Sequence, residues 1–140
     1  MYGEYQHVID SKGRMFLPAK FRSKLGEQVY LVKVLDRCIN IFSEASFHEF
    51  MKKVEDQPNE VTKGRAMKRR ISSTVSIIDV DAQGRVLINQ KLRDLAGLSK
   101  NVTVVGMGNR VEIWDPDAYT AAIDAVDDED LESAMISFGM

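Results

Sequence analysis

The sequence predicts an α+β protein that is built from two copies of one structural unit. A motif of the form Asp-x-x-Gly-Arg occurs twice, 71 residues apart, and the residues around it recur at the same spacing. Strand-like alternation follows each motif, and an amphipathic helix closes each copy. With 140 residues, of which 44% are apolar and 29% charged, the chain has the size and composition of one ordinary globular domain.

The repeat extends well beyond the motif itself. Residues 10–22 read DSKGRMFLPAKFR and residues 81–93 read DAQGRVLINQKLR, so that acidic, glycine, arginine, lysine and apolar positions coincide. Further along, the spacing becomes 72 residues, as in the match of Ile41 with Ile113. Internal repeats should be recognised before any motif is interpreted. We therefore expect the order strand, turn, strand, short helix, hairpin and helix in each copy.

Each motif predicts a tight turn between two strands. A strand at residues 6–9 enters the first turn, which has Asp10 at its first position and Gly13 at its fourth, as type I turns prefer. Arg14 then begins the return strand. The second copy places the same residue types at Asp81, Gly84 and Arg85.

A short helix and a hairpin follow each return strand. Pro18 opens the first short helix and Gly26 stops it in the left-handed conformation. Asn89 caps the second short helix and Gly97 stops it. The hairpin strands are expected at residues 29–34, 39–42, 102–105 and 111–114.

Each copy ends in a longer amphipathic helix. These helices open at Ser43 and at Asp115, and Pro116 occupies the first helical position of the second one. Apolar residues recur at i, i+3, i+4 and i+7 in both helices, which predicts that one face of each makes core or subunit contacts, with core contacts favoured. The two stripes are Phe47, Phe50, Met51 and Val54, and Tyr119, Ala122, Ile123 and Val126.

Two further segments lie outside the copies, which are assigned to residues 1–60 and 76–126. Residues 61–75 form a basic connecting segment, in which residues 62–70 hold five bases and no acid, so that a helix there is expected to be weak. Residues 127–140 form an acidic amphipathic helix that is expected to make core or subunit contacts. Its apolar stripe is Leu131, Ala134, Met135 and Phe138.

Charge is divided unevenly along the chain, although the net charge is only -2. Residues 1–110 hold all 19 Lys and Arg against 12 Asp and Glu, whereas residues 111–140 hold 9 acids and no base. A basic body with an acidic tail can present a positive face to a polyanion if the tail folds elsewhere. Two ordinary solvated surfaces would give the same division, so charge alone leaves both interpretations open.

The residues that the chain lacks disfavour several classes of function. Cys38 is the single cysteine and His7 and His48 are the only histidines, so we expect no disulfide, no metal site and no cofactor. No apolar run reaches the roughly 20 residues that span a bilayer, and the N-terminus does not have the pattern of a signal peptide. Asp10 and Asp81 could form a catalytic pair, but no nucleophile motif or phosphate loop accompanies them. We therefore expect a protein that is not an enzyme and that makes no membrane contact.

Taken together, these motifs resemble the MraZ family of bacterial transcriptional regulators. The resemblance covers nearly the whole chain and is carried by GEYQHVIDSKGRMFLPAKFR, the second Asp-x-x-Gly-Arg, LAGL and NRVEIW. It implies an AbrB-like, swapped-hairpin fold, in which the two repeats interlock into one strand-swapped β-barrel with helices on its outside. It also implies a cytoplasmic, nucleoid-associated homo-oligomer, an octamer-like ring. Its partner is double-stranded DNA, at direct repeats in the promoter of the division and cell-wall gene cluster that includes its own gene.

The chemistry of the repeated motif suits recognition of DNA. The guanidinium group of arginine matches phosphate and the O6/N7 edge of guanine, and a two-stranded ribbon is narrow enough to enter the major groove. Arg14 and Arg85 are therefore predicted to read bases. Asp10 and Asp81 position them, either by accepting N–H groups of the turn or by holding the guanidinium. The bases expected to contact phosphate around them are Lys12, Lys20, Arg22, Lys91 and Arg93.

Two other interpretations stay open at this point. Each Asp–Arg pair could be an ordinary surface ion pair, worth about 0 to 1 kcal/mol. The chain could also be an antitoxin-like or other oligomeric protein-interaction module without direct DNA readout, because AbrB-like folds serve in that role too. Duplication of the motif together with its flanking bases favours the DNA reader.

Overall fold

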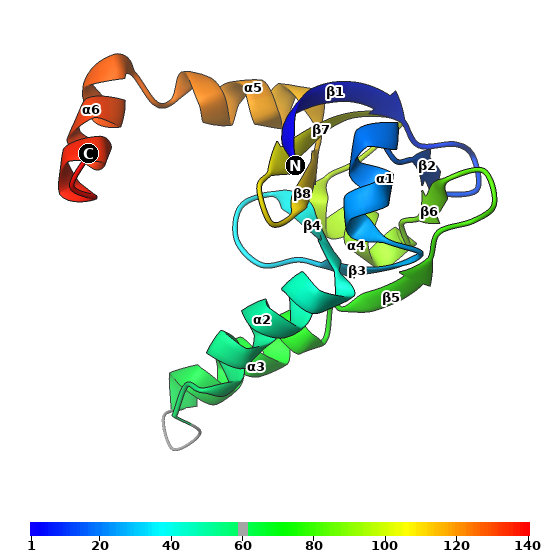
Figure 1. Cartoon of the computed structure of the whole chain (residues 1–140), viewed down its shortest axis with the longest axis horizontal. Coiled ribbons are helices and arrows are strands. Elements are labelled where there is room, and N and C mark those ends of the chain that lie inside the picture. The colour runs from blue at the N-terminus through cyan, green and yellow to red at the C-terminus, as the bar shows by residue number, and fades with distance from the viewer. Residues whose placement is uncertain (59–61) are drawn as a thin grey trace.

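A computed structural model describes residues 1–58 and 62–140, in which eight strands and six helices follow the order that the repeat predicts. The first copy comprises β1 (Tyr2–Val8), β2 (Arg14–Phe16), α1 (Ala19–Leu25), β3 (Gln28–Val32), β4 (Cys38–Ser43) and α2 (Glu44–Glu55). The second comprises β5 (Ser76–Asp79), β6 (Arg85–Leu87), α4 (Gln90–Ala96), β7 (Asn101–Met107), β8 (Val111–Trp114) and α5 (Pro116–Asp124). The remaining helices are α3 (Thr62–Ser72), between the copies, and α6 (Asp128–Ser137), after them (Figure 1).

The two copies exchange strands. Six antiparallel strands form one sheet in the order β1-β7-β8-β4-β3-β5, and β2 pairs with β6 in a separate two-stranded ribbon. The first strand of each copy therefore pairs with the other copy, since β1 lies against β7 and β5 against β3. β1 and β5 are the two edges of the sheet, so within the described residues the strand pairing does not close a barrel. The predicted α+β class is confirmed.

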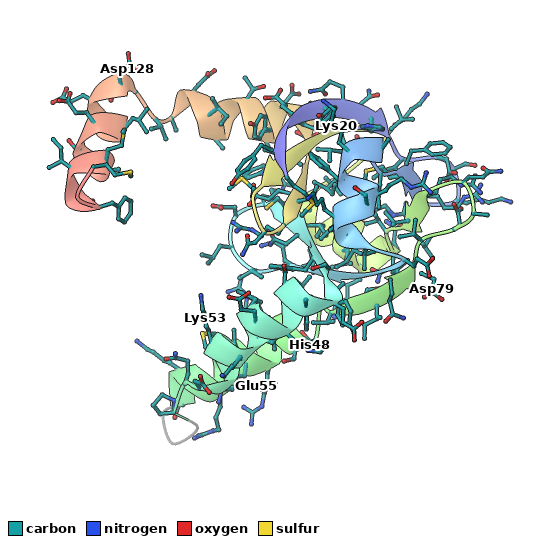
Figure 2. All side chains as sticks on the ribbon, viewed as in Figure 1. Lys20, His48, Lys53, Glu55, Asp79 and Asp128 are labelled. Atoms are coloured by element: carbon teal, nitrogen blue, oxygen red, sulfur yellow. The ribbon has the colours of Figure 1, made fainter. Side chains whose placement is uncertain are left out.

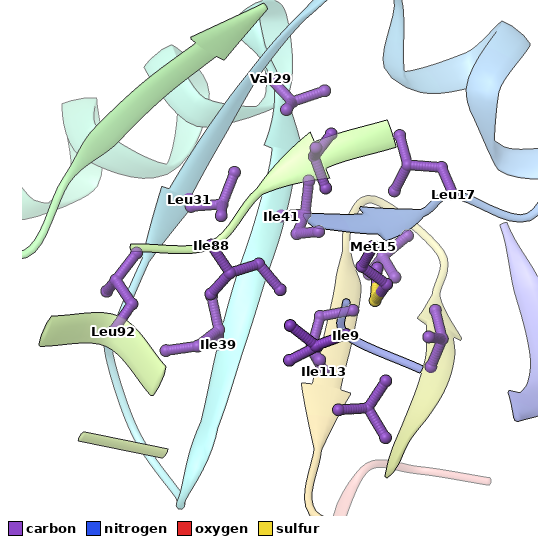
Figure 3. Packing of buried hydrophobic residues seen from close by; sticks show 14 of the residues in the cluster. Ile9, Met15, Leu17, Val29, Leu31, Ile39, Ile41, Ile88, Leu92 and Ile113 are labelled. Atoms are coloured by element: carbon purple, nitrogen blue, oxygen red, sulfur yellow. The ribbon is translucent and has the colours of Figure 1, made fainter. Parts of the chain in front are cut away.

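The main core lies between the sheet and the β2–β6 ribbon. Met15 and Ile88 come from different copies and are both fully buried there (Figure 3). The short helices α1 and α4 add Phe21 and Leu92 to the same cluster. Because side chains alternate between the two faces of a strand, the sheet carries a second apolar face, which α2 covers at β3 and β4.

The helix ends follow local sequence rules. Ser43, Asn89 and Asp115 each accept a hydrogen bond from the backbone N–H three residues further on, at 2.9 to 3.2 Å, as predicted for N-caps. Gly97 adopts the predicted left-handed conformation. Gly26 differs from the prediction, because its φ of +88° is combined with a ψ of -168°.

The basic connecting segment forms an 11-residue helix, α3, which corrects the expectation of a weak helix. Ile71 is buried in the cluster that holds the apolar face of α2. The Lys68 Nζ donates to the carbonyl oxygens of Glu55 and Gln57, at 3.2 and 2.8 Å. Burial of an apolar face and these bonds offset the repulsion among the five bases. The boundary predicted between residues 60 and 61 lies outside the described residues.

The helix that closes the second copy is not buried in the way the sequence predicts. Tyr119 packs against Trp114, with ring centroids 5.8 Å apart. Beyond it, Ala122, Ile123 and Val126 are exposed, as is every residue from 121 to 140. The favoured core contact was therefore wrong for most of this stripe, and the alternative of a subunit contact stays a prediction. A period of 3.6 residues defines an apolar face but not what covers it.

Candidate nucleic-acid interface

The β2–β6 ribbon brings the two Asp-x-x-Gly-Arg motifs together. Its strands are three residues long and antiparallel, and the opposed pairs are Arg14 with Leu87, Met15 with Val86, and Phe16 with Arg85. Met15 and Val86 are buried against the sheet. Because strand side chains alternate, the other four lie on the outer face of the ribbon. One face thus carries an arginine from each copy.

The first turn is held by its aspartate. Asp10 Oδ1 accepts hydrogen bonds from the backbone N–H groups of Lys12 and Arg14, both at 2.9 Å, and its Oδ2 accepts from Arg14 Nε at 3.0 Å. Asp10 therefore makes both of the contacts that the sequence left as alternatives. Gly13 has a φ of +83°, which residues with a Cβ rarely adopt, so this turn requires glycine.

The second turn reproduces the first. Asp81 Oδ1 accepts from the backbone N–H groups of Gln83 and Arg85, at 2.9 and 2.8 Å, and its Oδ2 accepts from Arg85 Nε at 2.8 Å. Gly84 also has a φ of +83°. The Arg85 Cζ lies 5.8 Å from the centroid of the Phe16 ring, which is a cation–π contact between the two copies.

These hydrogen bonds keep both carboxylates ionised. The backbone N–H of Arg14 is the main cause that lowers the pKa of Asp10 below its ordinary value of 3.8, and the backbone N–H of Arg85 does the same for the pKa of Asp81. A general acid or base that works near neutral pH needs a raised pKa. Burial raises the pKa of the Cys38 thiol to about 12, so this group is not an activated nucleophile either.

Among the described residues, each arginine side chain donates one hydrogen bond, to its aspartate. The aspartate takes the Nε–H, whereas the side chain has five N–H donors, four of them on the two terminal nitrogens. The side chains of Arg14 and Arg85 are 31% and 20% exposed. The outer face of the ribbon therefore presents two guanidinium groups whose orientation is set before any ligand arrives.

Arg22 and Arg93 each reach the turn of the other copy. Arg93 Nε donates to the carbonyl oxygen of Ile88 at 3.0 Å, and a terminal nitrogen of Arg93 lies 3.2 Å from where a Cβ on Gly13 would stand. The Arg22 guanidinium lies against Gly84 so closely that a Cβ there would collide with it. Both side chains thus brace a turn, a contact that the sequence did not predict beside their expected role with phosphate.

The three lysines expected to contact phosphate lie in different settings. Lys12 is exposed within the first turn, where the second copy has Gln83. Lys20 is exposed on α1 (Figure 2). Lys91 is exposed on α4, and its Nζ donates to the carbonyl oxygen of Ser73 at 3.0 Å, which ties α4 to the segment after α3. Of the three, Lys12 belongs to a ribbon turn itself.

Two residues of the ribbon face are missed from sequence alone. Phe16 and Leu87 are 49% and 44% exposed, and each lies opposite an arginine. Strand alternation could have identified them, because the neighbours of the buried Met15 and Val86 must point outward. Exposed apolar side chains beside arginine suit contact with the methyl group of thymine.

The ribbon lies at the end of the molecule opposite to the acidic tail. In Figure 1 the turns beside β2 and β6 project on one side of the body, and α5 and α6 project on the other. Glu112 does not belong to the tail surface, because it is buried in β8, where it accepts from Trp114 Nε1 at 3.0 Å and lies 3.6 Å from Arg110 Nη2. The exposed acids of the tail are thus placed away from a polyanion that meets the ribbon.

Within residues 1–58 and 62–140, no three side chains of His, Cys, Asp or Glu cluster in a way that could hold a metal ion. None of the helices in these ranges is long and apolar enough to cross a membrane. His48 lies exposed on α2, with its ring 5.6 Å from that of Tyr30.

Fold and site together define a duplicated α+β protein whose copies exchange strands and whose ribbon presents two oriented arginines. The family model described as "MraZ protein, putative antitoxin-like" matches residues 1–70 and 74–136 of this chain. The chain therefore belongs to the MraZ family, and the family predicted from the motifs is confirmed.

Individual relatives agree with this assignment. A protein named "Transcriptional regulator MraZ" from Acetivibrio thermocellus is 43% identical over 114 residues, which cover 81% of this chain and 80% of the relative. One of the same name from Halothermothrix orenii is 34% identical over 140 residues, which cover 99% and 98%. A solved structure, "The solution structure of PHS018 from pyrococcus horikoshii", is 15% identical over 80% of this chain and 86% of that chain. Its TM-score of 0.31 is too low to bear on the fold.

Proposed function

We propose that this chain is a sequence-specific DNA-binding protein, not an enzyme, that regulates transcription through its β2–β6 ribbon and uses no cofactor. The observation that carries the proposal is the pair Arg14 and Arg85, each fixed by an aspartate on the outer face of one narrow ribbon. A two-stranded ribbon fits the major groove, where arginine binds guanine. Relatives named as transcriptional regulators support the same function.

The dimensions of the ribbon suit this role. Two residues of strand rise and one strand spacing separate the Cα atoms of Arg14 and Arg85, which amounts to about 8 Å. Successive bases along a DNA strand are about 3.4 Å apart. The backbone positions of the two arginines are therefore separated by about two to three base-pair steps, and Phe16 and Leu87 lie beside them for apolar contact.

Phosphate contacts complete the proposed interface. Lys12, Lys20 and Lys91 supply positive charge around the ribbon, and Arg22 and Arg93 do so while they brace the turns. Such contacts fix the register of the protein on the duplex without reading sequence. They also make the affinity fall with salt, because each neutralised phosphate releases counterions.

Family membership supports a finer proposal for the target. The chain acts in the cytoplasm, at the nucleoid, on direct repeats in the promoter of the division and cell-wall gene cluster that includes its own gene. It does so as an octamer-like ring. Several copies in one ring bind several repeats at once, and the linkage raises the affinity of individually weak contacts through effective concentration.

We also propose that the interlocked copies form the AbrB-like, swapped-hairpin barrel. The exchange of β1 and β5 between the copies supports this architecture, with the ribbon packed over the main core. The proposed division assigns the two copies to residues 1–60 and 76–126. The basic connecting segment is then residues 61–75, and the C-terminal acidic helix is residues 127–140.

Anisotropy titrations with DNA from upstream of the chain's own gene test the regulator. Arg14→Ala or Arg85→Ala is expected to weaken binding by about 1 to 3 kcal/mol and to relax sequence preference. Lys12→Ala is expected to weaken binding to all sequences alike and to lower the salt slope by about one unit. Lys53→Ala, on α2 away from the ribbon (Figure 2), is the matched control and should change neither. Unchanged operator affinity in both folded arginine variants would remove the ribbon from the interface.

A second candidate function is an antitoxin-like or other protein-interaction module without direct DNA readout. The exposure of every residue from 121 to 140 favours it, because such a surface suits a protein partner. Deletion of residues 127–140 separates the two functions. If the chain is a DNA-binding regulator, the deletion variant keeps its binding to a single DNA site. If the chain is a protein-interaction module, the full chain binds no DNA and the deletion variant loses its protein partner.

A further inference from the structure

The arm, by which we mean α5 and α6, presents an apolar surface that the described residues leave uncovered. Ile123, Val126, Leu131, Met135 and Ile136 are each more than two-fifths exposed. The two helices have nine and ten residues. Helices shorter than about 12 residues are marginal in water unless they pack against something. The arm is therefore expected to pack against a partner.

The first copy shows the character of such a partner. Its closing helix, α2, buries Phe47 and Val54, and the basic helix α3 adds Ile71 to the same cluster. α5 follows 72 residues later at the equivalent position, but α6 leads away from it (Figure 1). Beyond Tyr119, the apolar stripe of α5 that matches the buried stripe of α2 is therefore bare, and its counterpart in the first copy packs with a basic helix.

A groove on the α2–α3 hairpin has the complementary character. It lies between the loop that follows β3 and the two helices, and its lining includes Leu35, Phe50, Met67, Lys33, Lys63 and Arg70. Leu35 is 75% exposed and lies with Phe50 and Met67 in the groove lining, so its apolar side chain is open to a partner. Asp36 adds one carboxylate among the basic groups.

Charge favours contact between the arm and this groove. After Arg110 the chain has no basic residue, whereas residues 62–70 of α3 hold five bases and no acid. Figure 2 shows side-chain oxygens around Asp128 at the start of α6. The acids on or next to α6 are Asp127, Asp128, Glu129, Asp130 and Glu132. The acidic helix with its apolar stripe is thus complementary to the basic groove with its apolar floor, and opposite charges steer such an encounter.

We propose that the arm of one copy docks into the α2–α3 groove of a second copy. Leu131 and Met135 pack on Leu35 and Met67, and the acids of α6 face the basic groove edge at Arg70. The inference rests on the proposed self-assembly and specifies its contact. Because the arm and the groove are different surfaces, the contact is heterologous, and its repetition closes a ring when the rotation between copies allows it.

The occupant is a second copy and not the arm of the same chain. α5 is tied to its own sheet by the contact of Tyr119 with Trp114, and a capping box between Asp127 and Asp130 fixes the start of α6. In Figure 1, α6 and the α2–α3 hairpin project separately from the body, and the ribbon lies away from both. Docking between copies therefore leaves the outer face of the ribbon uncovered.

Two complementary variants test the inference by gel filtration with light scattering. Leu131→Asp with Met135→Asp disables the arm, and Leu35→Asp with Met67→Asp disables the groove. All four side chains are exposed, so each variant should keep its fold, which circular dichroism checks. Each alone is expected at the monomer mass of 15.8 kDa, below that of the wild type. An equal mixture of the two variants is expected to form a dimer and nothing larger. The groove variant supplies one intact arm and the arm variant supplies one intact groove, so each pair can make a single contact.

Several outcomes would overturn the inference. These are a mixture that stays monomeric, a variant that keeps the wild-type mass, and a wild type that is itself monomeric. Ile77→Asp replaces an exposed isoleucine on β5 and is the control that should keep the wild-type mass.

If an aspartate variant does not fold, charge-reversal variants test the same contact. The arm reversal, Glu129→Lys with Glu132→Lys, and the groove reversal, Lys63→Glu with Arg70→Glu, should each weaken assembly. Both together in one chain should restore it. Absence of that restoration overturns the inference as well.

Binding to one DNA repeat separates this inference from the proposed function. The monomeric variants are expected to bind a single repeat within about twofold of the wild type, because the ribbon is untouched. If the wild type, the variants and their mixture have the expected masses but no operator is bound, the regulator fails and the contact stands. If both variants keep the wild-type mass and bind DNA, the contact fails and the regulator stands.

Discussion

The first and second copies of the repeat can be compared at two places, the turn that opens each copy and the helix that closes it. At the turns, Asp10 and Asp81 make the same three kinds of hydrogen bond, and the glycines share a φ of +83°. At the closing helices, Val54 is 7% exposed, whereas Val126, at the equivalent position 72 residues later, is 55% exposed. The copies are thus the same at one end and different at the other.

This difference shows which features a repeat preserves. A turn is determined by four or five residues that bond to one another, so the same residue types give the same geometry in both copies. A closing helix is determined by what packs on it. Within the described residues, α3 shares a buried cluster with α2, whereas α6 leaves α5 uncovered. Duplication therefore yields two equivalent arginines but two unlike surfaces, a groove in the first copy and an arm in the second.

The largest effect is expected from separating the copies. Residues 1–60 expressed alone should show no cooperative thermal transition by circular dichroism, because β1 and β2 pair with β7 and β6 of the second copy. A unit of about 60 residues is marginal even with a complete core. The full chain, which should melt in one transition, is the control. A monomeric fragment that melts cooperatively would show that the copies are independent domains.

A smaller but sharper contrast is expected between the closing helices. Phe47→Ala should lower the free energy of unfolding by about 3 to 5 kcal/mol, because it leaves a cavity beside Tyr30 and Phe42. Ile123→Ala should change it by less than about 0.5 kcal/mol. Urea denaturation at a concentration where the chain is monomeric measures both. A loss at Ile123 comparable to that at Phe47 would mean that α5 is buried in the single chain.

The turns allow a finer comparison through their glycines. Gly84→Ala should cost about 1 to 3 kcal/mol, because it combines a positive φ with a collision with Arg22. In an Arg22→Ala background the cost should fall, since the colliding group is removed. Gly13→Ala should be relieved less by Arg93→Ala, because its nearest neighbour is a main-chain oxygen at 3.1 Å. A double-mutant cycle measures this coupling, and equal relief in the two turns would contradict the difference.

The smallest effect is expected from pH. The pKa values of Asp10 and Asp81 are lowered, so the stability that their ionised forms contribute is present above the ordinary value of 3.8 and is lost as pH falls through the lowered pKa. Asp10→Asn and Asp81→Asn should each be less stable than the wild type at neutral pH, and the gap should narrow in acid. Urea midpoints between about pH 7 and about pH 3 measure it. A difference in stability between variant and wild type that widens in acid would contradict the predicted direction of the pH dependence.

The sequence predicts local structure well wherever a few neighbouring residues determine it. The turns that begin at Asp10 and Asp81, and the caps at Ser43, Asn89 and Asp115, depend on contacts within four residues, and they occur where expected. The exchange of strands could be expected only from the family resemblance. Alternation along β1 is the same whichever strand pairs with it, so the pattern does not select a partner.

The features that the sequence predicted wrongly or did not predict have one physical origin, which is their dependence on residues distant in the sequence. Five bases in residues 62–70 suggested a weak helix, but burial of Ile71 and the bonds of Lys68 depend on α2 and the loop after it. The stripe from Tyr119 to Val126 suggested a core face, yet periodicity does not supply a neighbour. In the site, the reach of Arg22 to the opposite turn follows from the strand exchange and has no local signal.

The pairing of β1 also sets when this chain can fold during its synthesis. Tyr2 pairs with Met107 and Val8 with Asn101, so β1 leaves the ribosome about 100 residues before its partner. At roughly 5 to 20 residues per second, that interval lasts about 5 to 20 s. During this time β1 offers unpaired N–H and C=O groups to any neighbouring nascent chain. Completion of the sheet waits for the second copy to be translated, and until then β1 is open to pairing with another chain.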